Sequence, residues 1–553
     1  MLEDFKESLL SYLFKEKALA EKEIEAIKNM TIEEKIANNL LLPNVSIVDS
    51  NESTYKLNVP NNYSKLRIGD RVKIFSDSKK HKAIILDIYK DNFTIECNAN
   101  LDEDLIYNIE IDSPNLIQAL IACLEDISAG KPGASFLRIL CGSEPIEIED
   151  FLALDPMQIK GFSNIYSRLN KEQQDAVKSM LRFPTIHILQ GPPGTGKTQV
   201  LAATAIATAI KNREVVIIAN THHAVNNALM KVRSFCGNST IIKVGDLLKN
   251  EDLDETIIKF SKFSEYNEWS YSTRKNKKSG HIIGMTIWGA ITHLGLHRHS
   301  HYRPYIALVD EASLMGLSYA SILGKCASSI CLFGDSCQMQ PIYRSELESD
   351  DYSVSIMDYC SDNVDNIPIS ILYTTYRMNE EIASVVSKSF YEPYGIKLIS
   401  SDYSRNNSLH LEGDEISSIK KIVVESENRH ENNPEEAQIV AKEIKFLLDQ
   451  GVNSKDIAVI TPFRKQVNEI RNAIYGFYDV ENLLVDTVER LQGQDVDVII
   501  LSFATSSFSY MECIQSFLFN KNRLNVMISR AKKQVIIVAS PIVMKNLDLI
   551  IKY

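Results

Sequence analysis

The sequence has no apolar run of the length that a membrane-spanning helix requires, although the chain has 553 residues. Its first residues, MLEDFKESLLSYLFKEKALAEKE, mix acidic, basic and apolar side chains. A secretory signal instead has a basic start followed by an unbroken apolar block. These two absences predict a soluble cytoplasmic protein that does not act at a membrane.

Cysteine pairs at metal-binding spacing are also missing. The nine cysteines are scattered, and no C-x-x-C pair occurs. This spacing argues against a zinc module and against a framework of disulfide bonds. We therefore expect no zinc, and we expect most cysteines to be small buried hydrophobic residues.

An excess of positive charge is the third absence. The formal net charge is −12, so overall charge gives no reason to expect a polyanionic partner. A nucleic-acid site would have to be a local basic track. The densest basic cluster lies in an expected insert at about 246–280, and it is either a solvated loop or a contact to a nucleic-acid backbone. It consists of Arg274, Lys275, Lys277 and Lys278.

Phosphate binding is what the sequence does indicate. Residues 186–198 read IHILQGPPGTGKT, a pattern typical of a short strand, a glycine-rich turn and the start of a helix. In such a loop, backbone N–H groups and the helix N-terminus surround phosphate oxygens, the lysine reaches the β- and γ-phosphates and the hydroxyl binds Mg²⁺. The pattern predicts an ATP site made by Gly191, Pro192, Pro193, Gly194, Thr195, Gly196, Lys197 and Thr198.

A second magnesium anchor follows in YIALVDEAS, residues 305–313. The apolar run predicts a strand, and two carboxylates stand at its end. Asp310 fits the role of holding Mg²⁺ together with Thr198, and Glu311 would polarise the attacking water. Surface carboxylates explain most such pairs, but this pair follows a phosphate loop in the same expected α/β sheet.

A phosphate loop alone does not identify a function, because kinases, GTPases and motors all use one. Five further motifs follow in order: CLFGDSCQMQP from Cys331, TTYRMNEEIASVVSKSFY from Thr374, ITPFRKQV from Ile460, VDTVERLQGQDVDVIILSF from Val485 and RLNVMISRAKK from Arg523. Together with LNKEQQDAV at 169–177 and ANTHHAVNNAL at 219–229, the series resembles the superfamily 1 helicases. It is most similar to the subfamily typified by the RNA helicase of nonsense-mediated decay.

The resemblance implies an ATP site between two domains. Gln338 would sense the γ-phosphate, and Arg377 and Arg530 would reach across the cleft, with Arg530 as an arginine finger in cis. Arginine suits this task because its planar, permanently charged group matches phosphate geometry. The expected catalytic residues are Lys197, Asp310, Glu311, Gln338, Arg377 and Arg530.

Other roles also come from the resemblance. Gln173 would read adenine and Tyr376 would stack on it, whereas Glu489 and Gly493 lie in the motif that links ATP to the nucleic-acid strand. The role of Arg523 stays open. One interpretation is structural, with Arg523 binding a carboxylate and so holding the motif in place. The expected nucleic-acid contacts are Thr221, His222, Thr286, Thr461 and Thr487. For each threonine, a turn or cap role is an equally good interpretation.

Several positions depart from the family pattern. Thr375 stands where glutamine is usual, Asn379 and Glu380 replace a His-Pro pair, and Ser529 replaces threonine before the expected finger. Glu489 and Leu491 stand where aspartate and phenylalanine are usual. Most changes keep the charge or the hydroxyl group, so they concern the strength of coupling more than ATP hydrolysis itself.

The expected fold is α/β, with two RecA-like domains that contain parallel sheets, preceded by a helical stalk and a small β-barrel. The order of helix, barrel and helix resembles the stalk and barrel of the same subfamily, and residues 119–142 are similar to a segment of the immunoglobulin-mu-binding-protein helicase. Within the second domain, Asn433, Pro434 and Gly451 predict the start and stop of one helix. No nuclease or zinc domain is expected after it. The expected boundaries are 1–42 for the stalk, 43–112 for the barrel, 113–150 for the returning helices, and 151–369 and 370–553 for the two RecA-like domains.

The motifs together predict an ATP-dependent helicase or translocase on single-stranded DNA or RNA. The resemblance implies 5′ to 3′ movement, and the choice of polymer depends on 2′-hydroxyl contacts that no motif specifies. An ATP-switched clamp or remodeller, for example in antiviral defence, shares every motif and stays an alternative, as does a protein partner. LNKEQQDAV and the separation of Arg377 from Arg530 argue against a kinase or GTPase, and the intact ATP motifs argue against a scaffold.

Overall fold

The computed structural model describes the chain except residues 39, 52, 61–65, 67–69, 77–78, 90–91, 113–115, 129, 131–132, 149–154, 236–238, 247–252, 274–279, 293–303, 342, 344–351, 412–413, 478–479, 481–482 and 489–494. The basic cluster Arg274, Lys275, Lys277 and Lys278 lies outside the described residues, and so do Glu489 and Gly493. Among the helices that are described, none combines the length and apolar character needed to cross a bilayer.

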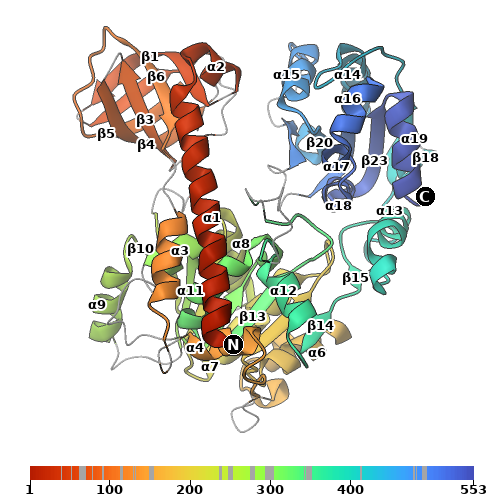
Figure 1. The fold of residues 1–553 in the computed structure, drawn as a ribbon. Helices are drawn as coiled ribbons and strands as arrows, with labels where there is room; N and C mark the ends of the chain where they lie inside the picture. The colour runs from red at the N-terminus through yellow and green to blue at the C-terminus, as the bar shows by residue number, and fades with distance from the viewer. Residues whose placement is uncertain are drawn as a thin grey trace.

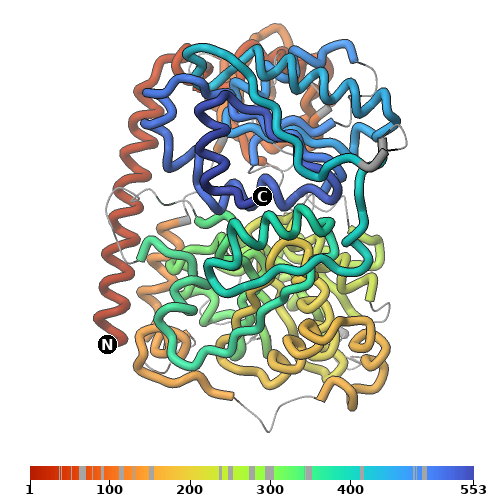
Figure 2. Tube along the Cα trace, turned by 90° about the vertical axis from the view of Figure 1, so that its right-hand side faces the viewer, coloured from red at the N-terminus to blue at the C-terminus, as the bar shows by residue number. Residues whose placement is uncertain are grey.

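A long N-terminal helix connects two parts of the molecule (Figures 1 and 2). Helix α1 (Leu2–Asn29) packs its first half on the large lower domain and carries the barrel beyond its far end. The helix expected over residues 1–42 is in fact two helices, because Thr31 begins α2 (Ile32–Ala37) with a capping box. Helices α3 (Leu116–Glu125) and α4 (Ala134–Leu140) return from the barrel, and α3 lies beside α1.

Six antiparallel strands form the closed barrel, in the order β1-β2-β5-β4-β3-β6. Alternate residues point inward, and Val45, Leu57, Ile74 and Ile85 fill its core. The strands are β1 (Leu41–Asn51), β2 (Thr54–Asn58), β3 (Arg71–Ser76), β4 (Lys79–Tyr89), β5 (Asn92–Cys97) and β6 (Ile106–Ile111).

The first α/β domain contains an eight-stranded sheet in the order β10-β9-β11-β8-β12-β13-β7-β14, in which every pairing is parallel. Its central strands are continuous apolar runs because helices cover both faces. Residues 369–371 also belong to this sheet, so the sheet extends past residue 369, the expected end of the first RecA-like domain. The strands are β7 (Ile186–Gln190), β8 (Val215–Ala219), β9 (Ile241–Val244), β10 (Ile258–Phe260), β11 (Ile282–Thr286), β12 (Ile306–Val309), β13 (Ser329–Gly334) and β14 (Ile369–Ile371).

Two groups of helices cover this sheet. One face packs against α6 (Lys171–Met180), α7 (Lys197–Ile210) and α8 (His222–Phe235). The other face packs against α1, α3, α4, α9 (Phe263–Thr273), α11 (Ala320–Cys326) and α12 (Ile356–Asn363). The short helices α5 (Ser163–Tyr166) and α10 (Ile287–Ala290) complete the domain.

The second α/β domain has a five-stranded parallel sheet in the order β19-β23-β22-β20-β21. Its strands are β19 (Ile419–Val423), β20 (Ile457–Ile460), β21 (Leu484–Asp486), β22 (Val496–Ser502) and β23 (Ala531–Ala539). Two small pairs precede them: β15 (Thr374–Thr375) with β16 (Ile399–Ser400), and β17 (Leu409–Leu411) with β18 (Asp414–Ile416).

Helices also cover both faces of this second sheet. Helix α14 (Pro434–Asp449) confirms the expected helix: the Asn433 side chain caps it, and Gly451 follows it with φ of 83°. With α15 (Arg464–Ala473) it covers one face. The other face packs against α13 (Glu380–Val386), α16 (Phe508–Cys513), α17 (Gln515–Leu518), α18 (Lys521–Ile528) and α19 (Pro541–Ile550).

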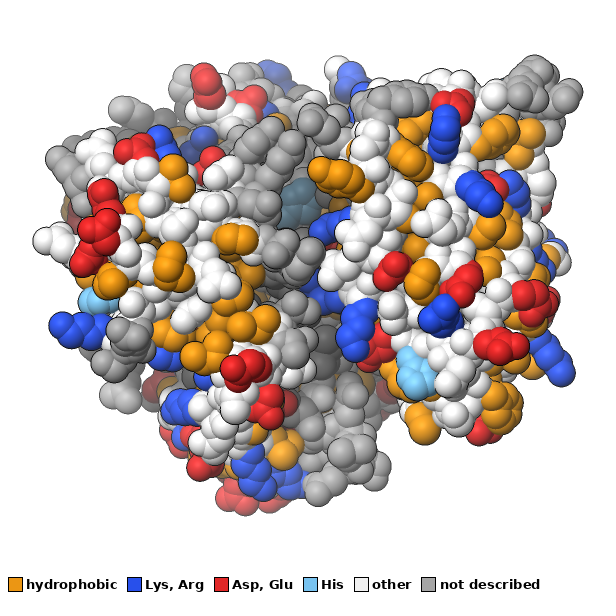
Figure 3. All heavy atoms as spheres, turned by 90° about the horizontal axis from the view of Figure 1, so that it is seen from above, with side chains coloured by type: hydrophobic (Ala, Val, Ile, Leu, Met, Phe, Trp, Pro, Cys, Tyr) orange, Lys and Arg blue, Asp and Glu red, His pale blue; other side chains and the backbone are white. Residues whose placement is uncertain are grey.

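The topology is that of two RecA-like domains with a stalk and barrel in front of them, as expected. The second domain sits on the first (Figure 2), beside the barrel (Figure 1). Seen from above, Lys and Arg side chains gather on the side of the second domain that faces the barrel (Figure 3). The chain is thus built as two α/β bodies that can hold a ligand between them.

Candidate nucleotide site between the two domains

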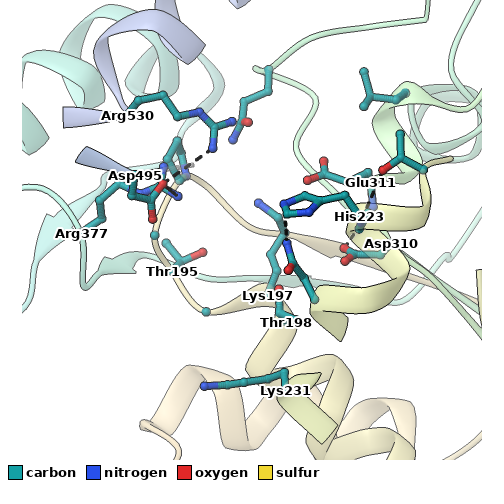
Figure 4. A pocket seen from close by; sticks show the side chains of 18 of the residues that line it. Thr195, Lys197, Thr198, His223, Lys231, Asp310, Glu311, Arg377, Asp495 and Arg530 are labelled. Carbon is teal, nitrogen blue, oxygen red and sulfur yellow. Dashed lines mark hydrogen bonds and ion pairs between the residues drawn. The ribbon is translucent and has the colours of Figure 1, made fainter. Parts of the chain in front are cut away.

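A cavity of about 860 Å³ lies where the two RecA-like domains meet. The first domain contributes the glycine-rich loop with Lys197, and also Asp310, Glu311 and Gln338. Arg377, Asp495 and Arg530 come from the second domain. Figure 4 shows the two arginines and Asp495 on one side of the cavity, and Asp310 and Glu311 on the other, with Lys197 between them.

The phosphate loop connects the end of β7 to the start of α7. Gly194 and Gly196 have φ values of 74° and 86°, which favour glycine. Space is equally restrictive, because a Cβ atom on Gly194 would lie 2.5 Å from Cβ of Arg377, and one on Gly196 would lie 2.5 Å from Nε2 of Gln173. The ammonium of Lys197 donates a hydrogen bond to the carbonyl of Gly191.

The second domain is attached directly to this loop. The hydroxyl of Thr375 donates to the carbonyl of Pro193 at 2.8 Å, and the backbone N–H of Tyr376 donates to the carbonyl of Gly194 at 2.9 Å. Thr375 therefore makes an interdomain contact at the position where the family pattern has glutamine.

Gln173 and Tyr376 lie next to the loop, as the adenine prediction requires. The buried Gln173 amide donates to the carbonyl of Thr195 at 3.0 Å and accepts from the backbone N–H of Asn170 at 3.1 Å. Asn170 also donates to the hydroxyl of Tyr376 at 3.0 Å, and this ring is 38% exposed. Gln173 thus holds the loop in this structure, and its contact with adenine stays a prediction.

Asp310 and Glu311 stand at the end of β12, at the edge of the sheet that carries the phosphate loop. Burial and the neighbouring Glu311 carboxylate raise the pKa of Asp310 to about 7, although Lys197 opposes this shift. Glu311 has φ of 54°, which is unusual for a residue with a side chain. The backbone conformation at Glu311 is therefore one that the surrounding structure imposes.

The donor set fits magnesium rather than a metal held by protein ligands alone. No group of three or more His, Cys, Asp or Glu side chains is ready to hold a metal in the part of the chain that the structure describes. Mg²⁺ commonly takes only one or two protein ligands together with substrate phosphates and water. The buried Asp310 carboxylate and Thr198 line the same cavity, and a cation there would stabilise the charged form of Asp310.

Arg377 and Arg530 approach the same carboxylate. Arg377 Nη2 lies 2.6 Å from Oδ1 of Asp495, and Arg530 Nη1 lies 3.8 Å from the same oxygen. Burial, and next the positive charge of Arg377, lower the pKa of Arg530 to about 10. The Nε atoms of both arginines are buried and have no hydrogen-bond partner among the described residues. The buried Arg530 and the half-buried Arg377 share one carboxylate, which leaves positive charge for an anion in the cavity.

Asp495 is a site residue that the sequence analysis did not single out. It stands in VDTVERLQGQDVD where the family pattern G-x-E-x-D has glutamate, and this position was the available signal. His223 and Lys231 were missed as well. Both line the cavity from α8, eight residues apart on one helix face, and His223 Nε2 lies 3.0 Å from Nδ2 of Asn227.

The expected nucleic-acid residues fall into two groups, one in each RecA-like domain. Thr221, His222 and Thr286 lie at the ends of the neighbouring strands β8 and β11, whereas Thr461 and Thr487 follow the neighbouring strands β20 and β21. The Thr221 hydroxyl accepts from the backbone N–H of Ala224 at the start of α8, and the Thr286 hydroxyl caps α10 in the same way. Thr461 is fully buried and Thr487 nearly so. The cap interpretation therefore describes Thr221 and Thr286 in this structure. Contacts of Thr221, His222, Thr286, Thr461 and Thr487 with a nucleic acid stay predictions.

Arg523 makes an aromatic contact. Its guanidinium carbon lies 4.3 Å from the ring centroid of Phe517. A structural role of Arg523 through a carboxylate stays a prediction. A cation over a ring also holds the start of α18, the helix that leads to Arg530.

Two family models of an AAA domain match the chain, one at residues 168–350 and one at 352–541. The DNA replication ATP-dependent helicase/nuclease JHS1 of Arabidopsis thaliana is 27% identical over 528 residues, which cover 86% of this chain and 37% of that protein. The DNA polymerase alpha-associated DNA helicase A of Schizosaccharomyces pombe is 24% identical over 458 residues, which cover 70% of this chain and 66% of that protein. Putative helicase mov-10-B.2 of Danio rerio is 26% identical over 415 residues, which cover 66% and 40%.

The chain spans less than two thirds of the length of these relatives. Among solved structures, the arterivirus nonstructural protein 10 helicase gives a TM-score of 0.44 at 11% identity, over 92% of this chain and 80% of that one. The phosphate loop, the carboxylate pair and the two arginines define a site of the P-loop ATPase class. The chain that carries it is homologous to superfamily 1 helicases of the helicase/nuclease and helicase A types.

Proposed function

We propose that the chain is an ATP-dependent helicase that translocates on single-stranded nucleic acid. The observation that carries the proposal is the cavity in which Lys197 and Glu311 of one RecA-like domain face Arg377 and Arg530 of the other. A nucleotide in this cavity touches both domains, so its binding and loss change how the domains sit together.

The chain's own residues would respond to ATP by exchanging partners. Lys197 would leave the Gly191 carbonyl for the phosphates. Arg377 and Arg530 would leave Asp495 for the γ-phosphate, which carries more negative charge than one carboxylate. These exchanges draw the second domain onto the phosphate loop, and hydrolysis releases it.

Glu311 would accept the proton of the attacking water, because it lines the cavity directly beside Asp310, on the side of the phosphate loop. Thr198 and Asp310 would hold Mg²⁺, which neutralises charge on the phosphates when it is bound. Gln338 lines the same cavity and would report the γ-phosphate to the second domain.

Movement along a strand follows from alternating domain closure. A strand that lies across both domains is gripped by each in turn, mainly through phosphates and sugars, so the grip tolerates any sequence and weakens with salt. The names of the Arabidopsis and fission yeast relatives favour DNA as the first polymer to test. We further propose 5′ to 3′ movement and a place in the subfamily of the nonsense-mediated-decay helicase, which the mov-10 relative supports.

Steady-state ATP hydrolysis tests the proposal. The rates would be measured without nucleic acid, with single-stranded DNA and with single-stranded RNA. Lys197→Ala is the inactive variant, and Lys211→Ala, an exposed lysine that follows the other end of α7, is its matched control. Stimulation by one polymer that is lost only in Lys197→Ala supports the proposal. ATP hydrolysis that neither polymer changes would contradict it.

A further inference from the structure

A chain of buried hydrogen bonds crosses from the first RecA-like domain to the second next to the nucleotide cavity. Its centre is Tyr391, which ends the helical turn after α13. The Tyr391 hydroxyl donates to Oδ2 of Asp335 at 2.6 Å and accepts from Nδ2 of Asn525 at 2.8 Å. Asp335 follows β13 of the first domain, and Asn525 lies on α18 of the second.

All three side chains are inaccessible to solvent. Tyr391 and Asn525 are fully buried, and Asp335 is 2% exposed. Burial raises the pKa of Tyr391 well above its ordinary value, so the hydroxyl keeps the proton that it donates. A buried polar group without a partner destabilises a fold. If one of these three hydrogen-bonded side chains shifts, the other two must therefore follow it to keep their partners.

The Asp335 end of the chain leads to the cavity. Oδ2 of Asp335 accepts a second hydrogen bond, from Nε2 of Gln338 at 2.7 Å. Its other oxygen accepts from Nε2 of Gln190 at 2.7 Å, and Gln190 is the last residue of β7 before the phosphate loop. Asp335 therefore fixes the side chain of Gln338, the residue that would sense the γ-phosphate.

The Asn525 end leads to the arginines. Asn525 also donates to the carbonyl of Cys337 at 2.7 Å. Helix α18 ends at Ile528, directly before Ser529 and Arg530, and the Ser529 carbonyl accepts from Arg377 at 3.0 Å. A displacement of α18 thus moves both guanidinium groups.

We propose that Tyr391 is a positioning residue that couples the Gln338 side chain to the placement of Arg530. Its hydroxyl makes Asp335 and Asn525 move as one unit, so that engagement of the γ-phosphate by Gln338 brings Arg530 to the same phosphate. The inference rests on the proposed function, and it adds a residue to which no role was assigned above.

Tyr391→Phe isolates the hydroxyl. The ring still fills its buried site, and Asp335 keeps three other donors, namely Gln190, Gln338 and the backbone N–H of Cys337. The link to α18 through the phenol is lost. Tyr394→Phe is the matched control, because Tyr394 lies three residues further along the chain and is 72% exposed.

The test measures kcat and KM for ATP with single-stranded DNA, and the Kd of a fluorescent ATP analogue. We expect Tyr391→Phe to lower the stimulated kcat about tenfold, the effect of one hydrogen bond to a charged group. The nucleotide Kd should stay within about twofold of the wild type, whereas Tyr394→Phe should change neither quantity. A kcat equal to that of Tyr394→Phe, or parallel losses of kcat, nucleotide affinity and thermal stability, would overturn the inference.

A double-mutant cycle gives a second readout. If both residues act through one path, the double mutant should lower kcat by less than the combined effects of Tyr391→Phe and Asp335→Asn measured separately. Additive effects would contradict the proposal. A wild type that nucleic acid does not stimulate would refute the proposed function and this inference together, whereas normal stimulation in Tyr391→Phe would refute only the inference.

Discussion

Arg377 and Asp495 form a 2.6 Å ion pair on the wall of the nucleotide cavity. The carboxylate also lies 3.8 Å from Arg530, so it neutralises part of the charge of both arginines. Its side chain is 33% exposed and lines the cavity, so a phosphate that enters the cavity competes with it for the guanidinium groups.

Asp495→Asn should therefore change the protein in two opposite ways. The nucleotide-free protein should lose about 1 to 2 kcal/mol of unfolding free energy, since two nearby cations lose their counter-charge. ATP should bind more tightly, because it no longer competes with a carboxylate. Thermal unfolding with and without ATP measures both effects. Asp497→Asn, which removes a carboxylate paired with Lys532 and Lys533, is the control. It should not increase the rise in unfolding temperature that ATP produces.

Arg530→Ala should abolish stimulated ATP hydrolysis with little loss of ATP binding. Loss of an arginine finger lowers kcat by about 10³ to 10⁵. Arg530→Lys should not restore the rate, because an ammonium lacks the planar fork. Arg523→Ala is the comparison in the same motif, since Arg523 stacks on Phe517. Wild-type turnover by Arg530→Ala would show that this arginine does not reach the phosphate.

Gly194→Ala separates backbone strain from crowding. Its φ of 74° costs a side chain about 1 to 2 kcal/mol, and its new Cβ would lie 2.5 Å from Arg377 and 2.6 Å from the Thr375 hydroxyl. Gly395→Ala has the same backbone cost at φ of 76°, but no atom of the described residues lies within 4 Å of its new Cβ. We expect both variants to lose stability, and only Gly194→Ala to bind ATP about tenfold or more weakly. Equal ATP affinities in a titration would contradict the crowding argument.

The buried Glu436 should make stability depend on pH. Burial raises its pKa to about 7, although Ser502 and the backbone N–H of Ala504 donate to it. A carboxyl group with a raised folded pKa binds more protons when folded, so its contribution falls as pH rises from about 4.5 to 7.

Glu436→Gln should flatten that slope by on the order of 3 kcal/mol across this pH range, as denaturant unfolding at several pH values would show. Glu435→Gln is the adjacent control. Arg429 lowers the pKa of Glu435, so this variant should remove a stabilisation that is present above pH about 4.5 and should leave the slope between pH 4.5 and 7 unchanged. A Glu436→Gln slope identical to the wild type would mean that the carboxyl group ionises freely in the fold.

Local chemistry explains which parts of the site could be predicted. The phosphate loop and the Asp310–Glu311 pair each occupy one short segment, so spacing and strand pattern were enough. Arg377 and Arg530 required the order of several motifs, and the structure places both at the cavity. The capping box at Thr31, which ends the first helix early, was a local signal that the apolar periodicity concealed.

The contacts that were missed join distant segments. Asp335, Tyr391 and Asn525 come from three regions of the chain, and nothing in any one of them specifies a hydrogen bond to the others. Asp495 acquires its role only because two arginines from other segments converge on it. Such relationships depend on how the domains are packed, which residue spacing alone does not determine.

The most direct measurement is ATP-driven displacement of a labelled strand from duplexes with a 5′ or a 3′ single-stranded tail, by the wild type and by Lys197→Ala. The account predicts displacement from the 5′-tailed duplex that requires ATP and is lost in Lys197→Ala. No displacement from either duplex, under conditions where single-stranded nucleic acid still stimulates ATP hydrolysis, would contradict translocation with unwinding and would indicate an ATP-switched clamp.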